Sequence, residues 1–141
     1  MSTRRFARVN FIPLTAMLLL LVISGCAAGN RSVADLTPAE AEKMIRTNQK
    51  DSAFVILDVR TPEEFNTGHL AGAVNVDYRS SDFQSRIDGL PKLRTYLLYC
   101  RTGHRSANAM SLMKARGFQK LYNMLGGITR WREENRDIGE N

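Results

Sequence analysis

The segment from Thr95 to Gly117, TYLLYCRTGHRSANAMSLMKARG, decides the fold, because it joins a buried strand to a helix through a tight loop. Residues 95–99 (TYLLY) form a run of strand length with little polar character, as expected for a strand covered on both faces. Residues 106–116 predict a helix with small and apolar side chains on its inner face, and Gly117 stands where such helices end. The segment therefore predicts one strand–loop–helix unit.

Similar units recur along the rest of the chain. Short runs at residues 53–57, 73–76 and 121–124 predict three more strands. Helices are expected at 37–47, from Thr61 onward, at 80–87 and at 128–135, and two of them begin with the same Thr-Pro-x-Glu capping signature. This alternation predicts an α/β fold with a central, mostly parallel sheet and helices on both faces.

The composition narrows the function classes. With 141 residues, 43% hydrophobic and 24% charged, the chain has the length of about one domain and is neither collagen-like, disordered throughout nor a multi-span membrane protein. The first 25 residues hold three of the 20 basic residues and none of the 14 acidic ones, so the remainder carries a net charge of +3. That excess is too small to indicate a nucleic-acid partner.

The N-terminus has the pattern of an export signal. Arg4, Arg5 and Arg8 precede the apolar run Leu14–Ile23, which is shorter than the about 20 residues that a spanning helix needs. Small residues follow, as at a cleavage site. We therefore expect residues 1–25 to be a signal peptide that takes no part in the fold.

The end of this signal is more specific. Ile23-Ser24-Gly25-Cys26 resembles the lipobox of bacterial lipoproteins, although an ordinary signal peptide with an incidental cysteine has similar features. The resemblance implies a lipid anchor on Cys26 and an exported protein facing the periplasm, and Ala27 after the cysteine resembles the pattern for the outer membrane. Residues 26–35 are expected to be a short tether and residues 36–139 the folded domain.

The loop after the Thr95–Tyr99 strand gathers features that favour an anion. Cys100 lies at the carboxyl end of this strand, where open α/β sheets bind ligands, and it is the one thiol left if Cys26 carries lipid. Gly103 permits a positive φ, the following helix presents free N–H groups, and Arg101 and Arg105 add positive charge. Such surroundings lower a thiol pKa and favour the thiolate.

Two other interpretations of Cys100 stay open from the residues alone. A cysteine at a strand end is often a small buried hydrophobe. Cys100 and His104 could also begin a metal site, with His69 as a distant candidate, but no third and fourth ligands are evident. We therefore expect no metal.

Three motifs in order resemble the rhodanese-type sulfurtransferases. CRTGHRS (100–106) is similar to their active-site loop, whose pattern is Cys-x-x-Gly-x-Arg. ILDVRTPEEFNTGHLAGAVNV (56–76) and GFQKLYNMLGGITRW (117–131) are similar to two further family signatures. The resemblance covers about residues 36–137 and implies a single rhodanese-like domain.

The resemblance also implies a reaction. A Cys100 persulfide would carry sulfane sulfur from thiosulfate or a persulfide, a small anionic donor, to a thiol, cyanide or protein acceptor, with no cofactor. A non-enzymatic persulfide carrier or partner-binding module at the membrane is the alternative. The donor would be bound by the rest of the loop: Arg101, Thr102, Gly103, His104 and Arg105.

Loop length and flanking charges refine this expectation. Four residues separate Cys100 from Arg105, whereas phosphatases and arsenate reductases that resemble this fold carry five. The shorter loop favours sulfur chemistry. Asp58, Arg60 and Glu64 match the family's ion-pair network behind the loop, and we expect them to be structural supports.

Overall fold

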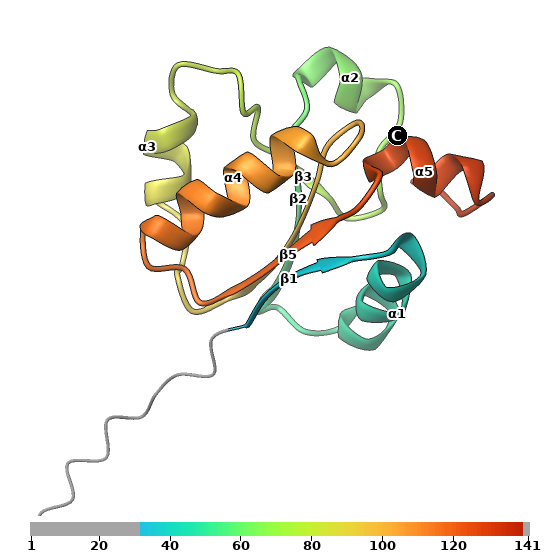
Figure 1. Cartoon of the computed structure of the whole chain (residues 1–141), viewed down its shortest axis with the longest axis horizontal. Coiled ribbons are helices and arrows are strands. Elements are labelled where there is room, and N and C mark those ends of the chain that lie inside the picture. The colour runs from blue at the N-terminus through green and yellow to red at the C-terminus, as the bar shows by residue number, and fades with distance from the viewer. Residues whose placement is uncertain (1–31, 140–141) are drawn as a thin grey trace, which may run out of the picture.

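The computed structural model describes residues 32–139, which form one α/β domain (Figure 1). Its elements, in chain order, are β1 (Ser32–Leu36), α1 (Pro38–Asn48), β2 (Phe54–Asp58), α2 (Pro62–Asn66), β3 (Val74–Asn75), α3 (Phe83–Asp88), β4 (Thr95–Tyr99), α4 (His104–Ala115), β5 (Lys120–Met124) and α5 (Gly127–Glu133). The predicted alternation of strand and helix is confirmed. No helix in this described range is both long and apolar enough to cross a bilayer.

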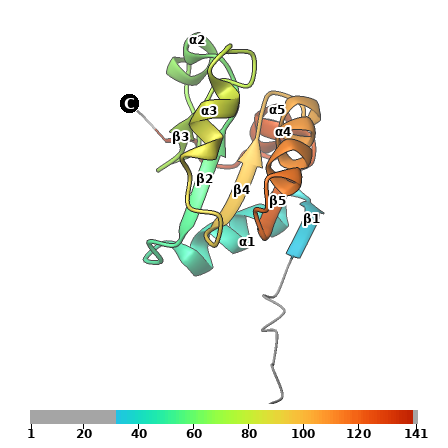
Figure 2. The same ribbon diagram turned by 90° about the vertical axis from the view of Figure 1, so that its left-hand side faces the viewer.

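The five strands form one parallel sheet in the order β1-β5-β4-β2-β3. Because every strand runs the same way, the segments that follow the strands all lie at one edge of the sheet and those that precede them at the other (Figure 2). The expectation of a parallel sheet with helices on both faces is confirmed. The loops before the strands and the loops after them therefore form two separate surfaces, one at each end of the strands.

The central strand β4 builds both halves of the core. Tyr96 and Leu98 pack with α3 and α4 on one face, while Leu97 and Tyr99 pack with α1 and α5 on the other. All four side chains are fully buried. Burial on both faces explains why this strand lacks an alternating polar pattern.

The two predicted helix starts are present. Thr37 caps α1 and Thr61 caps α2, and in each case the glutamate three residues on bonds back to the threonine backbone. These capping boxes satisfy N–H groups that the first helical turn leaves free. The start of α2 is thus closed by its own side chains.

The boundary between tether and domain was predicted wrongly. The interval expected as a tether, 26–35, includes most of β1, which pairs with β5 from Ser32↔Lys120 to Leu36↔Met124. Its sequence, SVADL, lacks an apolar run because an edge strand is only partly buried. The domain therefore begins at residue 32 rather than 36. The expected signal peptide and Cys26 lie outside the described residues.

Candidate active site

The Cys100 loop connects β4 to α4 and is held by unusual backbone geometry. Gly103 is the N-cap of α4 with φ +97°, and it offers no side-chain cap. A side chain in this conformation would be strained. Helix α4 begins at His104, two residues earlier than predicted, and the Ser106 N–H in its first turn bonds Cys100.

The Cys100 sulfur takes the place of a cap. Gly103 N–H donates to Cys100 Sγ at 3.1 Å, and Ser106 Oγ lies 3.5 Å from the same sulfur. Burial raises the pKa of Cys100, but hydrogen bonds from the Ser106 hydroxyl and from the N–H groups of Ser106, Thr102 and Gly103 together lower it below its ordinary value. This is the direction that the sequence predicted.

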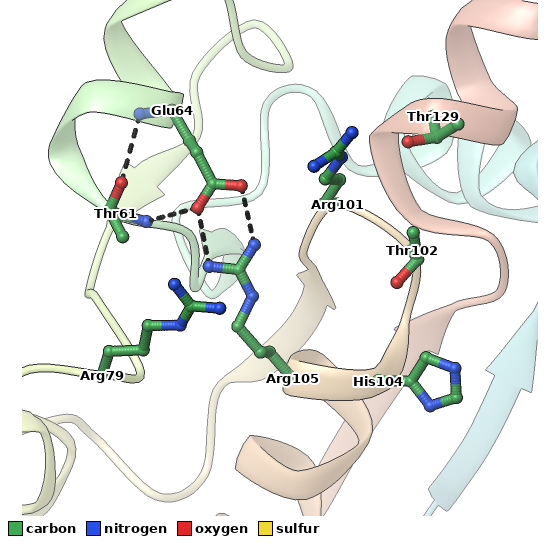
Figure 3. Close-up of a pocket in the computed structure, with 8 residues that line it drawn as sticks. All are labelled: Thr61, Glu64, Arg79, Arg101, Thr102, His104, Arg105 and Thr129. Atoms are coloured by element: carbon green, nitrogen blue, oxygen red, sulfur yellow. Dashed lines mark hydrogen bonds and ion pairs between the residues drawn. The ribbon is translucent and has the colours of Figure 1, made fainter.

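A cavity of about 690 Å³ opens above the loop (Figure 3). Four of the five residues predicted to bind the donor line it; the exception is Gly103, which is buried against Gly126. Cys100 is only 1% exposed and does not line the cavity. The lining residues are Thr61, Glu64, Arg79, Arg101, Thr102, His104, Arg105 and Thr129. A donor bound in this cavity would therefore have to move past the loop at residues 101–105 to reach the Cys100 sulfur.

Arg105, which was expected to bind the donor, is paired with a carboxylate in the structure. Its guanidinium forks onto Glu64 with two hydrogen bonds of 2.7 Å, so the fork expected to bind a substrate anion already holds a carboxylate. Hydrogen bonding from Arg105 lowers the pKa of Glu64 to about 2 although burial opposes it. The pair joins α2 to the start of α4 across the cavity (Figure 3).

The three predicted support residues form two pairs rather than one network. Arg60 is 3% exposed and donates to both carboxylate oxygens of Asp58, at 2.6–3.0 Å, and to the carbonyl of Gly68 at 2.9 Å. Glu64 instead binds Arg105. The Asp58–Arg60 pair fixes the turn after β2, as a structural role requires, because a buried charge needs a bonded partner.

Sequence reasoning missed Arg79, which lies between β3 and α3 and lines the cavity. The guanidinium groups of Arg79 and Arg101 make no hydrogen bond or ion pair with any residue in the described range, so the cavity has two uncompensated positive charges. Figure 3 shows them on either side of the Glu64–Arg105 pair. Nothing near Arg79 in the sequence indicates that the fold brings it to this loop.

The start of α5, at the end of the motif at residues 117–131, supports the Cys100 loop. The N–H groups of Ile128 and Thr129, at the start of α5, donate to the carbonyls of Cys100 and Arg101 at 2.9 and 3.0 Å. A Cβ on Gly127 would lie 2.3 Å from the Cys100 carbonyl oxygen. Glycine here therefore permits α5 to dock directly on the loop.

The two histidines lie in different environments. His104 lines the cavity, while His69 stacks on Phe65 at 3.7 Å between ring centroids, with its Nδ1 3.1 Å from the Phe65 carbonyl. Among residues 32–139, no three His, Cys, Asp or Glu side chains gather as metal ligands. His69 thus has a local structural role.

Comparison with known proteins identifies the family. The rhodanese-like domain family matches residues 37–134, and the chain belongs to it. Among solved structures, a rhodanese-related protein from Thermoplasma volcanium aligns with a TM-score of 0.62 and 27% identity over 75% of this chain and 97% of that one. The expected rhodanese-like fold is therefore confirmed.

Two relatives of this chain carry sulfurtransferase names. The probable adenylyltransferase/sulfurtransferase MoeZ of Mycobacterium tuberculosis is 31% identical over 80% of this chain, which spans only 28% of that protein's length. The thiosulfate:glutathione sulfurtransferase of Saccharomyces cerevisiae is 26% identical over 77% of this chain and 86% of that one. Family and relatives support a sulfurtransferase-type activity in general.

Proposed function

We propose that the chain transfers sulfane sulfur through a persulfide on Cys100. The single observation that carries this proposal is the Gly103 N–H held 3.1 Å from Cys100 Sγ at an uncapped helix start. Hydrogen bonding of this kind stabilises a thiolate, which is the nucleophilic form of cysteine.

The first half-reaction forms the persulfide. The Cys100 thiolate attacks the outer sulfur of thiosulfate, a new S–S bond forms, and the S–S bond of the donor breaks. Sulfite leaves with the electron pair of that bond. A persulfide donor reacts in the same way and releases a thiolate. Arg79 and Arg101, which have no carboxylate partner in the described range, attract the anionic donor.

The second half-reaction empties the enzyme. A nucleophilic acceptor, such as cyanide or a thiolate, attacks the outer sulfur of the persulfide. The Cys100 thiolate leaves with the bonding electron pair and is regenerated, and thiocyanate or a new persulfide is released. No redox cofactor enters this balance, because each step exchanges one nucleophile for another at sulfur.

The test is catalytic turnover by the chain from which the signal peptide has been removed. It should convert thiosulfate and cyanide to thiocyanate, and Cys100→Ser should abolish the reaction. Ser111→Ala, on the exposed face of α4, is the matched control and should leave it unchanged. Equal activity in the Cys100→Ser protein would refute the proposal. Persulfide formation without turnover would instead favour the carrier or partner-binding module.

We also propose that the domain is exported, anchored to a membrane by lipid on Cys26, and faces the periplasm. The lipobox at residues 23–26 supports this. Ala27 after the cysteine favours the outer membrane. Two or more acyl chains hold a protein stably on a bilayer. Cells given labelled fatty acid should label the wild-type chain, while Cys26→Ser should abolish labelling and leave an unprocessed precursor.

A further inference from the structure

One edge of the sheet concentrates positive charge, and it is the edge opposite Cys100. The segments that precede β2, β4 and β5, together with the last turn of α4, the last residue of α3 and the first residue of β5, carry six basic residues and two acidic ones, Asp51 and Asp88. We call this surface the basic edge; its basic members are Lys50, Lys92, Arg94, Lys114, Arg116 and Lys120.

This charge is a local feature. The described residues include 16 basic and 13 acidic side chains, so outside the basic edge the domain has a slight acidic excess. Arg116 binds Asp88 at 3.0 Å, which leaves Asp51 as the other acidic side chain among these segments. The net positive charge of the folded domain therefore resides at one end.

The basic edge also presents an apolar side chain to solvent. Leu93 is 72% exposed, the most exposed of the large hydrophobic residues that the structure describes, and it lies between Lys92 and Arg94. Its loop is fixed by hydrogen bonds from Tyr96 Oη to Pro91 O at 2.9 Å and from Gln119 N–H to Lys92 O at 3.3 Å. A rigid loop thus holds Leu93 outward among positive charges.

The chain enters the domain at this same edge. Ser32 begins β1 and pairs with Lys120, whereas Cys100 follows the far end of β4 (Figures 1 and 2). Five residues separate Cys26 from Ser32, and even fully extended they reach only about 20 Å. A lipid on Cys26 would therefore hold the basic edge, rather than the Cys100 edge, close to a bilayer.

We propose that the basic edge binds the surface of an anionic phospholipid membrane, with Leu93 entering the interface. Basic side chains around an apolar one suit such a surface, where phosphates attract cations and the acyl boundary accepts the leucine. This attraction acts over about 8 Å at physiological ionic strength, so a short connection to the anchor strengthens it by keeping the basic edge near the bilayer. The proposal extends the proposed lipid anchor and leaves the Cys100 cavity facing the aqueous phase.

Leu93→Trp provides the test. The processed full-length chain is reconstituted into vesicles of phosphatidylcholine with phosphatidylglycerol whose acyl chains are brominated, which quench indoles that enter the bilayer. Trp131 is 4% exposed and supplies the same background in every variant. The matched control is Val74→Trp, which is 51% exposed at wild type and pairs with Leu57 near the other end of β2.

The expected result is at least twofold stronger quenching for Leu93→Trp than for Val74→Trp, reduced by Lys92→Glu with Arg94→Glu and by replacing the anionic lipid. Equal quenching in the two tryptophan variants, while both chains float with the vesicles, would overturn the proposal. The anchor is scored separately by intact mass. If no lipid is attached, the basic edge alone should still give salt-sensitive quenching on anionic vesicles, and its absence would overturn the proposal.

Discussion

The two strand-to-helix turns after β2 and β4 begin alike and end differently. Helix α2 starts with Thr61 and Glu64, whose side chains bond the first free N–H groups. Helix α4 starts with Gly103, which has no side chain to do so, and the N–H of this glycine binds the Cys100 sulfur instead. One helix start is therefore closed by its own side chains, while the other is available to stabilise a thiolate.

The comparison assigns different tasks to the two turns. The turn after β2 is a support, since Arg60 and Asp58 fix it and Glu64 reaches across to Arg105. We propose the turn after β4 as the reactive element, because its N–H groups converge on the Cys100 sulfur. Substitutions can break each half of this comparison separately.

The largest effect is expected at Gly127. Gly127→Ala adds a Cβ that would lie 2.3 Å from the Cys100 carbonyl oxygen, at φ +56°, so we expect about 3–5 kcal/mol of destabilisation and loss of sulfur transfer. Gly72→Ala is the matched control, with φ +75° and no atom within 4 Å of its Cβ. It should cost only about 1 kcal/mol. Urea unfolding measures both, and equal midpoints would contradict the docking of α5 on the loop.

A smaller effect is expected at Glu64. The pKa of this carboxyl is lowered, so the stability from its pair with Arg105 is present above pH 4.5 and is lost as the pH falls toward 2. Glu64→Gln should lower the free energy of unfolding by about 1–2 kcal/mol at pH 7, a value that is reduced to allow for the partial exposure of the pair. Near pH 2 the variant and the wild type should be about equally stable.

Glu40→Gln is the control for this prediction, because Glu40 completes the same kind of capping box in α1 without an arginine partner. It should destabilise the protein less than Glu64→Gln does. Thermal unfolding between pH 2 and 7 measures both variants. A gap between Glu64→Gln and wild type that does not change over this interval would exclude the ion pair as its cause.

The smallest effect concerns the sulfur itself. Ser106→Ala removes a hydroxyl that lies 3.5 Å from Cys100 Sγ and lowers its pKa, so we expect the pKa of Cys100 to rise and persulfide formation at pH 7 to slow about tenfold. The pH profile of alkylation by iodoacetamide reports this pKa. Ser111→Ala, on the same helix with its hydroxyl bonded to Ala107 O, should leave the profile unchanged. Identical profiles for both variants would remove Ser106 from the site.

Local signals in the sequence predicted most of the fold and the conformation of the Cys100 loop. Apolar runs and capping signatures predicted the sheet and both capped helices, because these depend on neighbouring residues. The positive φ at Gly103 was also predictable, since the loop has one glycine between a strand and a helix. Such features need no knowledge of distant contacts.

Long-range contacts could not be predicted in the same way. Strand β1 is an edge strand with a mixed sequence, and its pairing with β5 joins residues nearly ninety positions apart. Arg79 reaches the cavity from another loop, and the fork of Arg105 is taken by a carboxylate 41 residues away. The near-complete burial of Cys100 likewise depends on its packing in the core cluster that includes residues of α3 and α4.

The most direct test of the account is the intact mass of the processed chain after exposure to thiosulfate and removal of excess donor. We expect one added sulfur atom per chain, located on Cys100, lost on treatment with cyanide, and missing in Cys100→Ser. An unchanged mass, in a sample whose Cys100 still reacts with iodoacetamide, would contradict the claim that this loop holds a sulfur-carrying thiolate.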